Sequence, residues 1–321
     1  MNMSTESTDH ESAMKDPAVT PAPSSGTGQR AVFDPSASRQ PLGLNHGPSA
    51  TGTRLDACAS RDMPAFIGYL PYGFPDHDTS IAALETLVRS GTDIVEIGLP
   101  YSDPVMDGPV IQSASQIALA AGERMEGVFD AVSAVARAGG IPLVMSYWNL
   151  IFHYGVERFA ARFADAGGAG LITPDLIPDE AGEWIESSQR HGLDRIFLVS
   201  PDSTDERLRV VARAGRGFVY AASRMGVTGE RSTLSTTPQE LVRRAKAAGA
   251  EHVCVGIGVS TPEQARQVGA YADGVIVGSA LVHTLLDGRG AALSDRDRAL
   301  HDLRLTATAL ARAAHEARRE S

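Results

Sequence analysis

Cysteine is scarce in this chain of 321 residues, and acidic residues outnumber basic ones. The two cysteines, Cys58 and Cys254, lie far apart in the sequence, so we expect neither a disulfide framework nor a cysteine-based zinc site. The nine histidines are not spaced as metal ligands are, and we expect no metal site. The formal net charge of -10 argues against the basic surface by which proteins bind nucleic acid.

Long apolar segments are also absent. No apolar run approaches the roughly 18 residues that a membrane-spanning helix requires. The first residues do not combine a basic stretch with an apolar core, the pattern of a secretory signal, so we expect a cytoplasmic protein. Hydrophobic residues nevertheless make up 43% of the chain and charged residues 21%, which is typical of a globular protein with a sizeable core.

The N-terminal segment differs in composition from the rest of the chain. Residues 1–52 are rich in Ser, Thr, Pro, Gly and Asp, and Phe33 is their only aromatic residue. Such a segment buries too little apolar surface to offset the entropy lost on ordering, so it is predicted to be a disordered extension. Its composition leaves open whether it is regulatory or inert. Residues 53–321 are predicted to form one catalytic domain.

In this domain, short apolar runs alternate with amphipathic stretches. Eight strands are predicted, over residues 65–70, 93–99, 142–146, 170–174, 195–200, 217–222, 252–258 and 273–278. Eight strands that alternate with helices predict an α/β fold of the (β/α)8 TIM-barrel type. An open, doubly wound sheet is the alternative, but it usually has fewer strands, and the even spacing along the chain favours a closed barrel.

Two helices have recognisable starts. Thr261, Pro262 and Glu263 supply a hydroxyl cap, a proline at the first helical position and an acid in the first turn. The closing helix is expected to begin after a cap at Ser294. Its apolar face carries Ala299, Leu303, Leu310 and Ala314.

A glutamate interrupts the apolar second strand, DIVEIGL. Because side chains alternate along a strand, Glu96 shares a face with Ile94, whereas Val95 and Ile97 share the other. The outer face of a barrel strand packs on helices and favours Val and Ile, so Glu96 is predicted to point inward, toward the mouth. Burial raises the pKa of a carboxyl group and suits it to general acid/base catalysis. The alternative is a structural ion pair, but no predicted strand carries an inward Lys or Arg near its end.

A second carboxylate follows in the loop PYSDPVMDGP. Aspartates before Pro or Gly are common turn residues, and taken alone Asp103 and Asp107 are both explained in that way. Asp107, however, lies far enough beyond the second strand to fold back over the barrel mouth beside Glu96. This position makes Asp107 a candidate for a functional carboxylate, whereas the turn interpretation stays open for both aspartates.

Glycine-rich loops follow the sixth, seventh and eighth strands. Gly258, Gly278 and Ser279 lie where barrels commonly bind a phosphate through free backbone N–H groups. Residues 223–236 are polar and too long for an ordinary connection, so they are predicted to form a lid that excludes water. A merely flexible loop is the alternative.

Four motifs together resemble one known family, the alpha subunit of tryptophan synthase. They are VEIGLPYSDPVMDGPVIQ, YAASRMGVTG, GIGVSTPEQ and VIVGSALV, and the resemblance extends in order over residues 53–288. It implies a barrel enzyme that cleaves indole-3-glycerol phosphate to indole and glyceraldehyde 3-phosphate. It implies no cofactor on this chain, since pyridoxal phosphate is expected only on a beta subunit that receives the indole in an αββα assembly.

The resemblance also implies roles for individual residues. Glu96 matches the catalytic glutamate, Asp107 the catalytic aspartate and Tyr220 a tyrosine beside the substrate. The lid positions match at Arg224 and Thr228. The phosphate-binding positions match at Gly229, Gly258, Gly278 and Ser279.

Some positions depart from the family pattern. The segment WNLIFHYG lacks a proline after the asparagine, and Ile177 replaces a more common proline. Both lie where the beta subunit is expected to dock. Three alternatives to the alpha-subunit hypothesis therefore stay open: a stand-alone lyase that releases free indole, a noncatalytic regulatory partner of a beta subunit, and a sister phosphate-binding barrel. The sister barrels rely on a lysine or a Cys/Asp pair at strand ends, which the sequence does not show.

Overall fold

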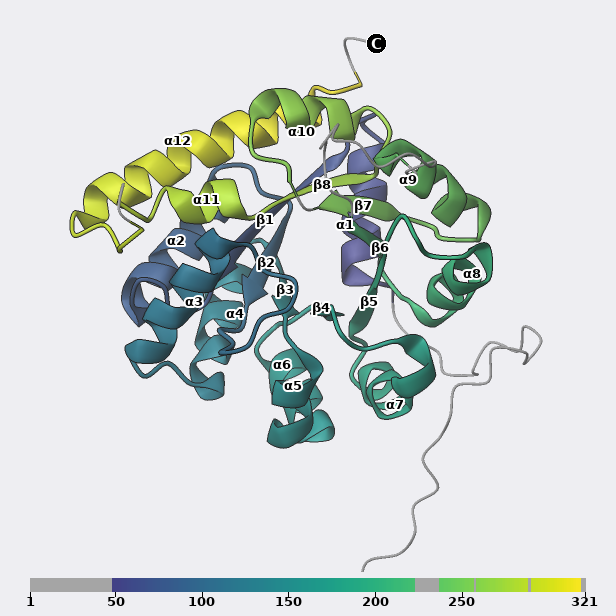
Figure 1. Cartoon of the computed structure of the whole chain (residues 1–321), viewed down its shortest axis with the longest axis horizontal. Helices are drawn as coiled ribbons and strands as arrows, with labels where there is room; N and C mark the ends of the chain where they lie inside the picture. The colour runs from purple at the N-terminus through teal and green to yellow at the C-terminus, as the bar shows by residue number, and fades with distance from the viewer. Residues whose placement is uncertain (1–47, 223–236, 257, 288–289, 319–321) are drawn as a thin grey trace, which may run out of the picture. The chain divides into compact units, whose positions relative to one another are not determined.

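The strands form a closed parallel barrel, and the computed structural model describes residues 48–222, 237–256, 258–287 and 290–318. Figure 1 shows the strands at the centre with the helices around them. The strands are β1 Ala65–Pro71, β2 Ile94–Gly98, β3 Ile141–Met145, β4 Gly170–Thr173, β5 Asp194–Val199, β6 Val219–Ala222, β7 Val253–Gly256 and β8 Gly274–Val277. All eight predicted strands and the closed barrel are confirmed.

Helix α1 precedes β1, and one or two helices follow each strand. They are α1 Ala50–Ala59, α2 His77–Arg89, α3 Pro109–Ala120, α4 Val128–Arg137, α5 Trp148–Tyr154, α6 Val156–Asp165, α7 Gly182–Arg190, α8 Asp205–Ala214, α9 Pro238–Ala247, α10 Pro262–Gly269, α11 Ser279–His283 and α12 Arg296–His315, with short 3-10 turns η1 Met125–Gly127 and η2 Pro178–Glu180. Within the described ranges, none of these helices is long and apolar enough to span a bilayer.

The register closes the barrel and sorts the side chains into two cores. Ile67 of β1 is paired with Ile94 of β2 on one side and with Ile276 of β8 on the other. These three side chains belong to the inner core, whereas Val95 and Ile97 belong to the outer core between strands and helices. The alternation predicted for the second strand is therefore confirmed.

Helix α1 closes the amino-terminal end of the barrel. Leu55 and Cys58 on this helix are fully buried in the inner core. The Thr51 hydroxyl donates a 2.7 Å hydrogen bond to Asp194, the first residue of β5. The barrel domain therefore already includes residues 48–52, which the sequence assigned to the extension; residues 1–47 lie outside the described residues.

The two helix starts have different outcomes. Thr261 caps α10 in a capping box with Gln264, with Pro262 at the first helical position, as predicted. Helix α12, however, is capped by Asp295 and not by Ser294, because the Asp295 carboxylate accepts a 3.0 Å hydrogen bond from the Arg298 N–H. The apolar face of α12 is buried as predicted, at Ala299, Leu303, Leu310 and Ala314.

Candidate active site

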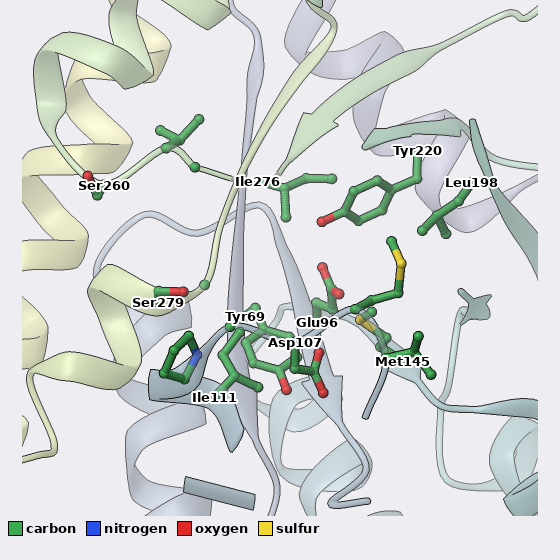
Figure 2. Close-up of a pocket in the computed structure, with 17 residues that line it drawn as sticks. Tyr69, Glu96, Asp107, Ile111, Met145, Leu198, Tyr220, Ser260, Ile276 and Ser279 are labelled. Carbon is green, nitrogen blue, oxygen red and sulfur yellow. The ribbon is translucent and has the colours of Figure 1, made fainter. Parts of the chain in front are cut away.

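A cavity of about 620 Å³ opens at the carboxyl ends of the strands. Figure 2 shows the side chains that line it. Six predicted site residues border it: Glu96, Asp107, Tyr220, Gly258, Gly278 and Ser279. Arg224, Thr228 and Gly229, predicted for the lid and the phosphate site, lie outside the described residues. The structure therefore brings together all the predicted site residues that it describes.

Glu96 is buried at the centre of this cavity. Its side chain projects from β2 with only 1% of its surface exposed, between Tyr69 of β1 and Leu143 of β3 in the register. One carboxyl oxygen, Oε2, has no hydrogen-bond partner in the described part of the chain. Burial, and secondarily the charge of Asp107, raises the pKa of Glu96 to about 8. Glu96 therefore holds a proton at neutral pH and can donate it.

Asp107 lies on the loop that joins β2 to α3. The residue is half-buried, and burial raises the pKa of its carboxyl above the ordinary value. Its backbone carbonyl accepts a 2.8 Å hydrogen bond from the Gln112 side-chain amide, which fixes the loop to the start of α3. Figure 2 shows the carboxyl groups of Glu96 and Asp107 in the same cavity. The loop thus returns over the mouth as the sequence predicted.

The opposite side of the cavity is made by backbone and small side chains. Gly258 has φ of +97°, which favours glycine over any other residue. Gly278 approaches Tyr69 so closely that a Cβ would lie 3.2 Å from the ring. Ser260 and Ser279 lie on this side in Figure 2. The described lining contains no Lys or Arg, so an anion held here would be bound by N–H and hydroxyl groups.

Sequence analysis missed the tyrosine on β1. The Tyr69 hydroxyl occupies space that a side chain on Gly98 would fill, since a Cβ there would lie 2.2 Å from it. In the same way, a Cβ on Gly256 of β7 would lie 2.2 Å from the hydroxyl oxygen of Tyr220 on β6. Burial, followed by nearby carboxyl groups, raises the pKa of both phenols well above the ordinary value, so both are neutral. The alternation rule that placed Glu96 could also have placed Tyr69, which follows Ile67 on the inward face.

Apolar side chains complete the wall. They come from α3, β3, β5 and β8, and they were not singled out from the sequence: Ile111, Met145, Leu198 and Ile276. Such a cavity accepts a flat apolar ring beside the carboxyls and an anionic group at the glycine loops. In the described residues no group of three or more His, Cys, Asp or Glu side chains is arranged to hold a metal ion.

Known proteins share this sequence and fold. A family model described as "Tryptophan synthase alpha chain" matches residues 55–315. The tryptophan synthase alpha chain of Bifidobacterium longum is 64% identical over 281 residues, which cover 88% of this chain and 97% of the relative. That of Mycobacterium avium is 57% identical over 240 residues, covering 75% of this chain and 89% of the relative.

Solved structures show the same likeness. A chain of Mycobacterium tuberculosis tryptophan synthase superposes with a TM-score of 0.75 at 50% identity, covering 84% of this chain and 99% of that chain. The tryptophan synthase alpha subunit of Legionella pneumophila superposes with a TM-score of 0.72 at 30% identity, covering 83% and 98%.

Proposed function

The chain belongs to the tryptophan synthase alpha chain family, and from this premise we propose that Glu96 and Asp107 are its catalytic residues. The chain is a lyase that cleaves indole-3-glycerol phosphate to indole and glyceraldehyde 3-phosphate in tryptophan biosynthesis. The observation that carries the assignment of residues is a buried Glu96 whose Oε2 has no partner among the described residues and whose pKa is about 8, in the same cavity as Asp107.

The proton of Glu96 starts the cleavage. Glu96 donates it to C3 of the indole ring, which makes the ring an electron acceptor. The bond from C3 to the glycerol side chain then breaks, and its electron pair returns to the ring. The proton of the hydroxyl group on the released carbon passes to the Glu96 carboxylate, so an aldehyde forms and the acid is regenerated. Because protons and electrons balance with one carboxyl group, we propose that the chain requires no cofactor of its own.

Asp107 stabilises the protonated ring. Protonation at C3 places positive charge on the indole nitrogen, and an ionised carboxylate accepts a hydrogen bond from that N–H. The pKa of Asp107 is raised by burial, but the ring N–H and the developing charge favour its ionised form when substrate is bound. Tyr220, with its neutral phenol, would lie beside the substrate.

The phosphate of the substrate is assigned to the glycine loops. Gly258, Gly278 and Ser279 line the cavity and offer N–H and hydroxyl donors, and Figure 2 shows Ser279 away from the carboxyls. Binding energy from this remote group can hold the reacting carbon in place. Gly229, Arg224 and Thr228 are assigned to the phosphate site and the lid on the family resemblance alone.

A beta subunit is the proposed partner. Four of the six exposed large hydrophobic residues among the described ones lie on loops and helices at the barrel mouth: Val105 (84% exposed), Met106 (44%), Phe152 (49%) and Ile177 (44%). Exposed apolar patches commonly mark protein–protein interaction sites. Here the patch surrounds the site that releases indole, so it suits a partner protein that receives the indole. The pyridoxal phosphate expected in such an assembly would belong to the beta subunit. The cytoplasmic location stays a prediction.

One assay distinguishes the remaining candidates. Indole release from indole-3-glycerol phosphate is measured for the purified full chain with and without a beta subunit. Strong stimulation by the partner supports the alpha-subunit assignment, and full activity alone supports a stand-alone lyase. Asp107→Asn should lower turnover about 100-fold, whereas Asp103→Asn, an exposed acid on the same loop, should leave the isolated chain unchanged. Equal effects of the two substitutions would contradict the role of Asp107.

A further inference from the structure

The loop that carries Asp107 is held from outside the cavity by one phenol. Tyr147 follows β3 and precedes α5, and only 5% of its surface is exposed. Its hydroxyl oxygen accepts hydrogen bonds from the backbone N–H groups of Val105 and Met106, both at 2.9 Å. These residues immediately precede Asp107, so the phenol holds the loop next to the catalytic carboxyl.

The chemistry of the phenol fits this contact. A tyrosine hydroxyl has two acceptor lone pairs and one donor hydrogen. Two adjacent N–H groups therefore match its acceptor capacity, and phenylalanine, with the same ring, would offer neither bond. The Val105 side chain is 84% exposed, so side-chain packing contributes little to the position of the loop tip. On its other side the loop is held by the bond from Gln112 to the Asp107 carbonyl.

The phenol is itself fixed by neighbouring loops. Tyr101 stacks on Tyr147, with ring centroids 4.6 Å apart and planes at 29°. The Tyr101 hydroxyl accepts a 3.1 Å hydrogen bond from Asn149 on α5. The N–H of Trp148 donates to the Asp175 carboxylate beyond β4 at 2.9 Å. The loops after β2, β3 and β4 thus set the position of one hydroxyl group.

We propose that Tyr147 is a positioning residue for the lyase reaction, acting by anchoring the loop that places Asp107 in the cavity. The inference rests on the catalytic role proposed for Asp107. Tyr147 does not line the described cavity, so it contributes through the loop and not by touching the substrate. A residue that acts in this way affects turnover more than substrate binding, because the phosphate is bound elsewhere.

The first test is a double-mutant cycle in the full chain. Tyr147→Phe should lower kcat roughly 10- to 100-fold, as expected for a displaced catalytic group, and change KM by less than about threefold. In an Asp107→Asn background, Tyr147→Phe should cause almost no further decrease in kcat. Tyr154→Phe is the matched control, since it removes a phenol of α5 that bonds Arg162 at the surface. Equal losses from Tyr147→Phe in both backgrounds would overturn the proposal.

The second test does not depend on the reaction. Amide hydrogen exchange of the peptide that contains Val105 and Met106 should be faster in Tyr147→Phe and unchanged in Tyr154→Phe. Unchanged exchange in Tyr147→Phe overturns the anchoring itself. Faster exchange combined with full turnover in Asp107→Asn supports the anchor and contradicts instead the role proposed for Asp107.

Discussion

Asp93, which immediately precedes β2, and Glu96, in the middle of β2, are both buried, but they have opposite surroundings. Asp93, at the amino-terminal end, accepts hydrogen bonds from the Phe66 N–H at 2.9 Å and from His315 at 2.7 Å. Burial would raise its pKa, but these bonds outweigh burial, and the pKa of Asp93 is lowered. Glu96, which lines the cavity, has an oxygen without a partner in the described residues, and its pKa rises to about 8.

Burial alone therefore does not distinguish a structural acid from a catalytic one. Asp194, also at the amino-terminal end, is fully buried; its Oδ2 accepts bonds from Ser49, the Thr51 N–H and the Thr51 hydroxyl, and its Oδ1 faces the Arg216 guanidinium at 3.3 Å. Hydrogen bonds and a counter-charge let Asp194 hold α1 against β5, and hydrogen bonds lower the pKa of Asp93. Glu96 has no hydrogen bond to its Oε2 and no ion pair within the described ranges, and its raised pKa keeps the proton available for chemistry. The comparison predicts different consequences of substitution at the two ends of the barrel.

The largest effect is expected at Glu96. Glu96→Gln keeps the size of the side chain but removes the transferable proton, so kcat should fall on the order of 1,000-fold. The stability of the variant should not fall, because Oε2 makes no hydrogen bond to any residue that the structure describes. Indole release and thermal unfolding measure the two quantities. If Glu96→Gln were destabilised or retained its turnover, the distinction between a catalytic acid at the cavity and structural acids at the amino-terminal end of the barrel would be contradicted.

At the amino-terminal end the pattern should be reversed. Asp194→Ala leaves Arg216, which lies 3.3 Å from the Asp194 carboxylate, without this counter-charge. Breaking a buried pair of this kind typically costs about 3 to 5 kcal/mol of unfolding free energy. The turnover of the folded fraction should be unchanged, because α1 and β5 meet away from the cavity. Urea denaturation gives the stability, and Asp202→Ala, at an exposed acid, is the control. Equal stabilities of the two variants would contradict the structural role.

The two ends should also respond oppositely to pH. Asp93 has a lowered pKa in the folded state, so its contribution to stability is present above the unfolded value of about 4 and is lost as pH falls below it. Glu96 has a raised pKa in the folded state. Its ionisation therefore lowers the unfolding free energy as pH rises from the unfolded pKa of about 4 to the folded pKa of about 8.

Two measurements test these signs. The unfolding free energy of Glu96→Gln relative to the wild type should increase as pH rises from 5 to about 8. In the wild type, kcat/KM should decline above about pH 8, where the acid form of Glu96 is lost. A stability difference that is independent of pH would contradict the raised pKa.

The smallest effect concerns the apolar surface at the mouth. Phe152→Ser should weaken binding of the beta subunit about tenfold, as expected for loss of one buried aromatic contact, and leave the isolated activity unchanged. Leu305→Ser on α12 is the control, since Leu305 is similarly exposed, at 51%, but lies on a helix that packs against α10 and α2. Sedimentation or titration calorimetry with the partner measures the difference. Equal weakening by both substitutions would place the interface elsewhere.

Sequence patterns predicted the features that depend on neighbouring residues. Short apolar runs located all eight strands, and the alternation of side chains along the second strand placed Glu96 on its inward face. The Thr261-Pro262 signal located the start of α10. At α12 the predicted cap, Ser294, was wrong, because the next residue, Asp295, caps the helix. The carboxylate was the better acceptor for the first turn, which local sequence alone did not reveal.

Features that depend on distant contacts could not be predicted. Residues 50–52 were assigned to the extension because their small side chains bury little surface, yet Thr51 is bonded to Asp194 across 143 positions of the chain. Tyr147 was an ordinary residue in the sequence, since its bonds to the loop of Asp107 join residues 41 and 42 positions apart. Only the closed barrel brings such groups together.

The protonation of Glu96 in the resting protein tests the central claim most directly. Carbon-13 NMR of the full chain labelled at glutamate side-chain carboxyls, compared with Glu96→Gln, assigns the resonance of this group and follows it with pH. The account predicts a midpoint at about 8, raised by burial and by Asp107. A midpoint near 4, the ordinary value for glutamate, would contradict it.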